Sequence, residues 1–343
     1  MKALVLEEYN KFVYKDVPEP EIKADEVLVR VRACGICGSD IHGMDGTTGR
    51  RIPPVIMGHE ASGVIAETGT DVRGWKAGDR VTFDSTVYQL DDWYSRNGHY
   101  NLSDNREVLG VSPGTYRRNG AFAEYVAIPQ HILYRIPENV TFEQAAMVEA
   151  VAVALHSVNI SSMKPGSSCL VTGAGMIGVF LIKLLKVVGP SVIIAADINK
   201  ERLETAKAAG ADSVLIAADG SFSEKIGSFT SGRGADIVFD VAGTNDSFNT
   251  SVNSVRKGGT LVLVGNFTPV VEFPLQKVVT GELKILGSCA ICGEYETVLE
   301  YMKTGKITVH DQIGQVAPLS EGAYWFDRLH NKKDIQGKVI LVP

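Results

Sequence analysis

The chain has 343 residues, which is the length of about two domains. Hydrophobic residues make up 45% and charged residues 22%, a balance typical of a globular protein with a large core. The formal net charge of −6 comes from 34 basic and 40 acidic residues, so the basic excess of a nucleic-acid-binding protein is missing. Five cysteines are too few, and odd in number, for a disulfide scaffold; they favour a reducing compartment.

The ends of the chain carry no pattern that we interpret as a targeting signal. The first residues contain an apolar run of only four, Ala3–Leu6, which is too short for a signal peptide. The most apolar stretch, Met176–Val188, is interrupted by Lys183 and Lys186, so we do not expect it to cross a membrane. We therefore expect a cytoplasmic protein without a membrane partner.

Short strands and glycine-rich turns are expected over the first 150 residues. Val27–Val31 alternates apolar and polar side chains, as a half-buried strand does. Glycines then separate short apolar runs, in the manner of turns in an all-β unit. The segment 84–119 has little periodicity and many polar residues, and we interpret it as a large lobe or loop with a functional or structural role.

After about residue 160 the sequence predicts strands that alternate with helices. This order is typical of a doubly wound α/β fold with a parallel sheet. The expected helices are Met176–Val188 and Lys200–Ala209, and the expected strands are Ser168–Thr172, Val192–Ala196, Asp236–Val241, Thr260–Val264 and Leu283–Leu286.

A dinucleotide-binding motif stands between the first of these strands and the first helix. Gly173, Gly175 and Gly178 fit the pattern G-x-G-x-x-G, whose glycines allow a tight turn, close approach of a pyrophosphate and close packing of helix on strand. Asp197 follows 19 residues after Gly178, where a carboxylate can accept hydrogen bonds from the ribose hydroxyls of NAD. Ile198 offers no cation for the 2′-phosphate of NADP, so the motif favours NAD.

Candidate zinc ligands occur close together in the β-rich half. Cys37, His59 and Glu60 would supply a thiolate, an imidazole and a carboxylate, and zinc bound to them could lower the pKa of an alcohol. Ser39 and His42 could then lead the alcohol proton to solvent. Taken alone, Gly-His-Glu is more often an ordinary turn. Cys34 and Cys37 could instead be a redox pair, although their strand-then-glycine setting predicts no helix N-terminus to activate a thiol.

The chain resembles the zinc-dependent medium-chain dehydrogenase/reductase family over essentially its whole length. The motifs that carry the resemblance are G-I-C-G-S-D-I-H, I-M-G-H-E-A-S-G-V, G-A-F-A-E-Y and G-A-G-M-I-G, in this order. It most resembles the polyol branch, which includes sorbitol, threonine and galactitol-1-phosphate dehydrogenases. The resemblance implies a GroES-like β-barrel catalytic domain at residues 1–154 and 290–343, and a Rossmann NAD-binding domain at 155–289.

The resemblance also implies roles for individual residues. Cys37, His59 and Glu60 would bind zinc, Glu149 would either bind zinc or hold its water, and Asp40 would orient the His59 ring. Arg202 would lie against the adenosine of the cofactor. The complete expected cofactor site consists of Gly173, Gly175, Met176, Ile177, Gly178, Asp197, Arg202, Val241, Val264, Gly265, Ser288 and Cys289.

One departure from the family pattern lies in the 84–119 lobe. Many members bind a structural zinc there through four cysteines spaced C-x2-C-x2-C-x7-C. This spacing falls on Gln89, Asp92, Ser95 and Ser103, and such side chains are poor zinc ligands. We therefore predict one catalytic zinc per chain and no structural zinc in the lobe.

The resemblance implies an NAD-dependent dehydrogenase that converts a secondary alcohol, a polyol or a sugar-alcohol phosphate, to a ketone. The proton would leave through Ser39, the nicotinamide ribose and His42. A homodimer or homotetramer is implied as well. The alternatives are a zinc-free NAD(P)H quinone or enone reductase of the same fold, and a non-catalytic nucleotide-binding relative.

The pairs Arg50–Arg51 and Arg117–Arg118 could grip a substrate phosphate, although solvated surface arginines are more common.

Overall fold

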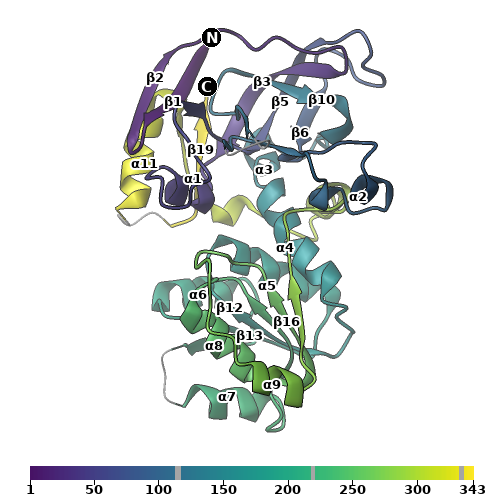
Figure 1. Cartoon of the computed structure of the whole chain (residues 1–343), viewed down its shortest axis with the longest axis vertical. Coiled ribbons are helices and arrows are strands. Elements are labelled where there is room, and N and C mark those ends of the chain that lie inside the picture. The colour runs from purple at the N-terminus through teal and green to yellow at the C-terminus, as the bar shows by residue number, and fades with distance from the viewer. Residues whose placement is uncertain (113–116, 218–220, 332–335) are drawn as a thin grey trace. The chain divides into compact units, whose positions relative to one another are not determined.

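The computed structural model describes residues 1–112, 117–217, 221–331 and 336–343 (Figure 1). Its contacts divide the chain into two compact units, one of residues 1–149 with 291–343 and one of residues 150–290. The domain boundaries expected from the sequence stay a prediction; the first of them falls inside helix α4 (Val148–Ile160). Within the described residues, no helix has both the length and the apolar character needed to cross a bilayer.

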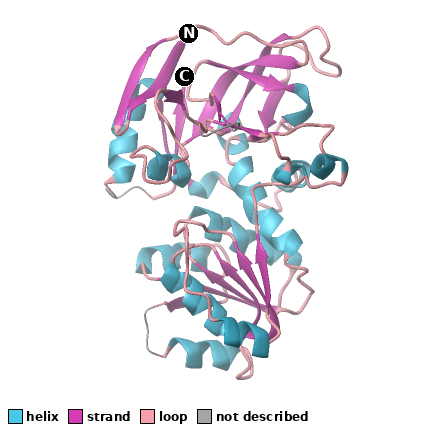
Figure 2. Ribbon diagram, viewed as in Figure 1, coloured by secondary structure: helices cyan, strands magenta, loops and turns pink. Residues whose placement is uncertain are grey.

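The first unit is built on a seven-stranded sheet in which β3 (Glu26–Gly35) is the central strand (Figure 2). β3 pairs antiparallel with β5, β10 and β19, so it joins segments from both ends of the chain. The other strands of this sheet are β5 (Glu60–Thr68), β6 (Arg80–Phe83), β10 (Tyr125–Pro129), β11 (Leu133–Arg135), β18 (Ile313–Pro318) and β19 (Lys338–Val342).

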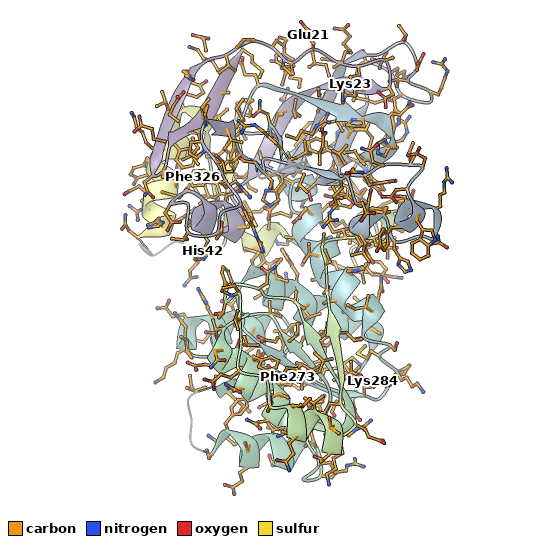
Figure 3. All side chains as sticks on the ribbon, viewed as in Figure 1. Glu21, Lys23, His42, Phe273, Lys284 and Phe326 are labelled. Carbon is orange, nitrogen blue, oxygen red and sulfur yellow. The ribbon has the colours of Figure 1, made fainter. Side chains whose placement is uncertain are left out.

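A smaller sheet and several helices complete this unit. The sheet has the order β2-β1-β4, and its strands are β1 (Lys2–Glu8), β2 (Lys11–Asp16) and β4 (Val55–Ile56). The remaining helices are α1 (Gly38–Gly43), α3 (Phe142–Ala145), α10 (Tyr295–Lys303) and α11 (Gly322–His330). Phe326 of α11, labelled in Figure 3, is buried. Its ring stacks on that of Phe12 of β2, with ring centroids 4.2 Å apart. The C-terminal helix is thereby held against the N-terminal hairpin.

The lobe expected at 84–119 contains short elements and not only loop. They are β7 (Thr86–Val87), α2 (Trp93–Arg96), β8 (Glu107–Leu109) and β9 (Arg117–Arg118). The four positions of the cysteine spacing lie together and are joined by hydrogen bonds. Gln89 N donates to Ser103 Oγ at 3.2 Å, and Ser95 N donates to Asp92 Oδ1 at 2.7 Å.

Asp92 is the centre of this hydrogen-bonded group. Its Oδ2 also accepts a hydrogen bond from Asp104 N at 3.0 Å. The Ser103 hydroxyl and the Ser95 amide stabilise the ionised carboxylate, and these contacts lower the pKa of Asp92 to about 2. A carboxylate therefore organises the backbone around the four positions on which the cysteine spacing falls. The absence of a lobe zinc stays a prediction.

The second unit is a six-stranded parallel sheet in the order β14-β13-β12-β15-β16-β17. This is the doubly wound order of a dinucleotide-binding fold, so the fold class predicted from the sequence is confirmed. Its strands are β12 (Ser168–Thr172), β13 (Val192–Asp197), β14 (Ser213–Ile216), β15 (Ala235–Asp240), β16 (Val255–Leu263) and β17 (Lys284–Gly287). Its helices are α5 (Met176–Val188), α6 (Lys200–Ala208), α7 (Phe222–Phe229), α8 (Asn245–Ser254) and α9 (Leu275–Thr280).

Loss of the Asp92 charge should loosen the lobe in a pH-dependent way. Because its pKa in the folded protein is depressed, Asp92 stabilises the folded state above pH 4, and this contribution disappears as the pH falls toward 2. We expect Asp92→Asn to speed amide hydrogen exchange of residues 89–104 at pH 7. Asp91→Asn, an exposed neighbour, is the matched control. Equal exchange rates in the two variants would show that Asp92 does not hold the lobe.

Candidate active site

Three predicted zinc ligands come together in the first unit. Their ligand atoms, the Cys37 thiol sulfur, a ring nitrogen of His59 and a carboxylate oxygen of Glu60, all lie within 4.8 Å of one another. His59 and Glu60 are buried, and Cys37 is half-buried. Sulfur, nitrogen and oxygen donors at this spacing fit a zinc ion with one position left for another ligand. Elsewhere in the described chain, no other group of three such side chains meets this criterion.

Local backbone features bring the three side chains to one place. Gly58 has φ +95°, and a Cβ there would lie 2.8 Å from Cys34 Sγ. Only glycine therefore fits at the position that leads into His59 and the start of β5. Cys37 is the N-cap residue of α1. The sequence-based view that Cys37 lacks a helix N-terminus is therefore wrong, because the glycine after it is the first helical residue.

The redox alternative for Cys34 and Cys37 is disfavoured by the surroundings of Cys34. Burial, together with the charges of Asp40 and Glu60, raises the pKa of the Cys34 thiol well above its ordinary value. A thiol that stays protonated is a poor nucleophile for disulfide exchange. All five cysteines of the chain are free.

Asp40 lies next to His59, where the family resemblance places it. Its Oδ1 is 3.5 Å from His59 Nδ1, and its Oδ2 accepts a hydrogen bond from Cys37 N at 3.2 Å. Burial alone would raise the pKa of Asp40, but His59 and Arg51 hold it well below its usual range. For His59, burial lowers the pKa, and the Asp40 carboxylate more than offsets this and raises it.

Glu60 forms a buried ion pair with Lys338, the first residue of β19. Lys338 Nζ lies 2.7 Å from Oε1 and 2.5 Å from Oε2, and both side chains are at least 95% buried. The pair fits because Gly35 has no side chain; a Cβ there would lie 2.6 Å from Glu60 Oε2. Burial lowers the pKa of Lys338, but the negative charge of Glu60 outweighs this effect and raises it.

Glu149 is a second buried carboxyl near these residues. Burial raises the pKa of Glu149 to about 7, and the positive charges of His59 and Lys338 partly oppose this shift. Its side chain is not part of the compact group formed by Cys37, His59 and Glu60. The geometry thus favours Glu60 over Glu149 as the carboxylate nearest the other two ligands.

The proposed proton-relay residues share helix α1. Ser39 and His42 are three residues apart, so they project from the same face of the helix. His42, labelled in Figure 3, is exposed in the last turn of this helix. Ser39 is half-buried near the start of the helix. The order along the helix therefore runs from the neighbourhood of Cys37 toward solvent.

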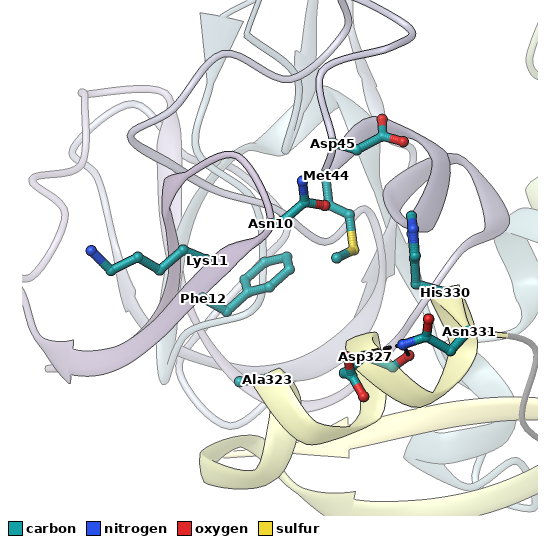
Figure 4. A pocket seen from close by; sticks show the side chains of 9 residues that line it. All are labelled: Asn10, Lys11, Phe12, Met44, Asp45, Ala323, Asp327, His330 and Asn331. Carbon is teal, nitrogen blue, oxygen red and sulfur yellow. Dashed lines mark hydrogen bonds between the residues drawn. The ribbon is translucent and has the colours of Figure 1, made fainter.

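A cavity of about 600 Å³ opens in the same unit, and none of the predicted site residues lines it. Figure 4 shows the side chains that line it, with Phe12 and Met44 among polar groups such as Asp45, Asp327 and His330. Cys37, His59, Glu60 and Glu149 do not line this cavity. It has no part in the candidate metal site.

The glycine-rich loop of the second unit has the features that a dinucleotide requires. Gly173 has φ +100°, and a Cβ at Gly178 would lie 2.0 Å from Gly173 O, so these glycines form the turn and the close contact of α5 with it. A Cβ at Gly175 would meet nothing within 4 Å, which leaves open space at the N-terminus of α5. Such a cradle fits a pyrophosphate.

Asp197 ends β13 next to this loop. Its Oδ2 accepts a hydrogen bond from Ala174 N at 2.8 Å, and its Oδ1 accepts one from Asn199 N at 2.9 Å. Arg202 lies 3.9 Å from Oδ2, and its side chain is mostly exposed. Each carboxylate oxygen keeps a lone pair for a ribose hydroxyl.

The other expected cofactor residues follow the carboxyl ends of neighbouring strands. Val241 follows β15, Val264 and Gly265 follow β16, and Ser288 and Cys289 follow β17. This edge of a doubly wound sheet is where ligands bind. Ser288 Oγ is buried and has no hydrogen-bond partner in the described chain, so it is available to a ligand.

Two arginines do not behave as the phosphate hypothesis assumed. Arg51 is 2% exposed and donates to Asp40 Oδ1 at 2.9 Å. Arg118 donates to both Glu26 and Glu107 at 2.6 Å. Because each guanidinium already neutralises a carboxylate, the hypothesis of phosphate-gripping arginines is wrong for these two residues.

Sequence reasoning missed Arg51 and Lys338 as parts of the site. Arg51 belongs to an Arg-Arg pair that suggests an exposed surface, and nothing in its spacing points to Asp40. Lys338 is 278 residues away from Glu60. A lysine that begins an otherwise apolar C-terminal strand was the only available signal.

Comparison with known proteins identifies the family. Residues 23–138 match the model of the alcohol dehydrogenase GroES-like domain, and residues 177–304 match the model of zinc-binding dehydrogenases. D-xylulose reductase A of Aspergillus oryzae is 33% identical over 97% of this chain and 95% of its own length. The chain therefore belongs to the zinc-binding alcohol dehydrogenase family, and it is an NAD(P)-dependent oxidoreductase. The family predicted from the sequence motifs is confirmed.

Solved structures show the same fold. Galactitol-1-phosphate dehydrogenase of Escherichia coli has a TM-score of 0.92 at 25% identity, with 100% of both chains covered. The E. coli CFT073 alcohol dehydrogenase rspB, solved with NADH, has a TM-score of 0.92 at 28% identity, covering 100% of this chain and 99% of its own. A zinc-binding dehydrogenase of Sinorhizobium meliloti 1021, solved with NADP, has a TM-score of 0.90 at 29% identity, with the same coverage.

Removing Lys338 should destabilise the first unit strongly. Lys338→Met leaves the Glu60 carboxylate buried beside no partner cation, and we expect the free energy of unfolding to fall by about 3–5 kcal/mol. Urea unfolding of the zinc-free protein measures this change. The double variant Glu60→Gln/Lys338→Met removes both charges and should recover most of the loss. If the double variant is as unstable as the single one, the ion pair is not the cause.

Proposed function

We propose that this enzyme oxidises a secondary alcohol group of a polyol to a ketone, with zinc at Cys37, His59 and Glu60 and with NAD as hydride acceptor. The observation that carries the proposal is the meeting of these three donor types within 4.8 Å, in a chain that also bears the glycine-rich loop followed by Asp197. Family members that act on D-xylulose and on galactitol 1-phosphate support this substrate class.

Each donor has a distinct part in the proposed site. Zinc, when bound, supplies a Lewis acid that lowers the pKa of the substrate hydroxyl. Asp40 orients the His59 ring, so that its second nitrogen is directed to the metal. Lys338 holds the Glu60 carboxylate in place, and Glu149 provides a further buried carboxyl close by for a water molecule or a fourth ligand position.

The proton of the alcohol is proposed to leave along α1. Ser39 accepts it near Cys37, and His42 delivers it to solvent from the exposed end of the same helix face.

NAD is the proposed cofactor in preference to NADP. The Asp197 carboxylate would repel a 2′-phosphate, and Ile198, which is 78% exposed, offers that phosphate no cation. The mostly exposed Arg202 lies beside Asp197, 3.9 Å from its Oδ2, and is already paired with this carboxylate. The expected cofactor site comprises the loop from Gly173 to Gly178 and the residues that follow β13, β15, β16 and β17.

An unphosphorylated polyol is the first candidate substrate, and a sugar-alcohol phosphate is the second. The engagement of Arg51 and Arg118 in ion pairs favours the first, because two of the four arginines considered for a phosphate are already neutralised. The zinc-free reductase of the same fold is disfavoured, since it would have no use for a compact Cys-His-Glu group. The same group argues against a non-catalytic relative.

Replacing the thiolate ligand should abolish activity and remove zinc. We expect Cys37→Ser to lower kcat/KM for polyols by at least about 100-fold and to lower the zinc content from one per chain toward zero. Wild type and variant are assayed with a panel of polyols and their phosphates, with NAD and with NADP. Cys292→Ser, at another partly buried cysteine of the same unit, is the control. Full activity of Cys37→Ser would exclude the proposed role of zinc, and two zinc ions per wild-type chain would contradict the prediction for the lobe.

The second unit offers a surface for the proposed homodimer. Strand β17 is an edge of the six-stranded sheet. In the sheet order of the described residues, the backbone N–H and C=O groups along one side of β17 therefore pair with no other strand. Exposed apolar side chains precede β17 in the chain; they are Phe267, Val270, Phe273, Leu275 and Val279. Figure 3 labels Phe273 and Lys284, the first residue of β17. Leu275 and Val279 share one face of α9. Pairing of two β17 strands across a two-fold axis would bury this surface; a homotetramer is the alternative.

Charges placed on this surface should break the dimer. In sedimentation, we expect the wild-type protein to have at least twice the 37.0 kDa mass of the chain. Leu275→Glu/Val279→Glu should shift it to the monomer mass, because two buried carboxylates oppose association. Leu90→Glu, at an exposed lobe residue, is the control and should leave the mass unchanged. A wild-type monomer would refute the proposal.

A cytoplasmic location remains part of the proposal. It is supported by the five free cysteines, of which Cys34 and Cys169 are fully buried as thiols.

A further inference from the structure

We infer that Arg51 is a positioning residue for the zinc site and acts on the ligands through Asp40. Arg51 is 2% exposed, Asp40 is fully buried, and the Arg51 Nη2 atom donates to Asp40 Oδ1 at 2.9 Å. The inference rests on the proposed metal site at Cys37, His59 and Glu60. It extends that site by a cation that forms an ion pair with Asp40.

The chain makes room for this arginine inside the protein. Gly43, in the last turn of α1, faces the side chain of Arg51; a Cβ there would lie 2.6 Å from Arg51 Cγ. Asp40 and Gly43 are three residues apart and therefore share one helix face. The guanidinium thus lies along the face of α1 that presents Asp40, and its Nη1 also donates to Arg50 O at 3.3 Å.

Asp40 connects Arg51 to two of the three proposed ligands. Its Oδ1, which accepts from Arg51, also lies 3.5 Å from His59 Nδ1, and its Oδ2 accepts from the backbone N–H of Cys37 at 3.2 Å. One carboxylate therefore lies beside the His59 ring and accepts a hydrogen bond from the N-cap residue of the helix that follows Cys37. With Nδ1 on the Asp40 side, Nε2 is the nitrogen left for the metal.

The charge of Arg51 keeps this carboxylate in its position. A buried carboxylate needs a partner cation or several hydrogen bonds. Without Arg51, the partners of Asp40 are one backbone N–H and the ring of His59, and Asp40 would turn toward water or another donor. Either movement would release the His59 ring from its orientation. The competing explanation is that Arg51 serves overall folding only.

Zinc affinity separates the two explanations. In Arg51→Met and Arg51→Gln, we expect the dissociation constant for zinc, measured by competition with a chelating dye, to rise about 10–100-fold. The absorption spectrum of the cobalt-substituted protein should change as well, because it reports ligand geometry. Arg51→Lys restores the charge and should recover part of the affinity. Arg30→Met, at an exposed arginine of β3, is the control and should bind zinc like the wild type.

The outcomes distinguish failure of this inference from failure of the proposed function. If the wild-type protein binds no zinc, the proposed metal site is wrong. If the wild type binds zinc and both neutral variants bind it equally tightly with an unchanged cobalt spectrum, Arg51 has no positioning role, whatever their thermal stability. Should Arg51→Met fail to fold, Arg51→Gln and Arg51→Lys carry the comparison, and wild-type zinc affinity in Arg51→Gln overturns the inference.

Discussion

Two buried carboxyl groups of the candidate metal site each lie against a buried cation. Asp40 pairs with Arg51, and Glu60 pairs with Lys338. A buried carboxylate without such a partner is costly enough to change its protonation or its position. Asp40 and Glu60 can therefore remain buried next to His59 because the fold places Arg51 and Lys338 beside them. The strand pairing of the first unit explains how one of these ion pairs forms.

The central strand β3 brings Glu60 and Lys338 together. It pairs on one side with β5, which begins at Glu60, and on the other with β19, which begins at Lys338. Gly35, at the end of β3, leaves the space in which the two side chains meet. The last strand of the chain is thus needed to complete an arrangement whose other members all lie within its first 60 residues.

Local signals in the sequence were sufficient for the first strand and helix of the dinucleotide-binding unit, whereas β14, α7, α8 and α9 were not predicted. Helix Met176–Val188 and strand Ser168–Thr172 have the bounds that were expected, because caps, turns and apolar runs determine them within a few residues. Cys37, His59 and Glu60 could likewise be identified from short motifs. Lys338 and Arg51 could not, since a buried ion pair depends on side chains that meet only after folding. Periodicity also gave no sign of the short elements that Asp92 organises in the lobe.

The same physical reasoning bears on the choice between Glu60 and Glu149 as a ligand. Glu60 is close to Cys37 and His59 and lies against the buried Lys338 ammonium, whereas burial raises the pKa of Glu149 to about 7. A metal ligand must give up its proton, so the carboxylate that already has a cation beside it is the easier one to recruit. Lys338 also shares the charge of Glu60, and sharing weakens the hold of that carboxylate on a metal ion. We therefore favour Glu60 as a ligand of moderate strength, with Glu149 as the second carboxyl that is free to interact with water or substrate.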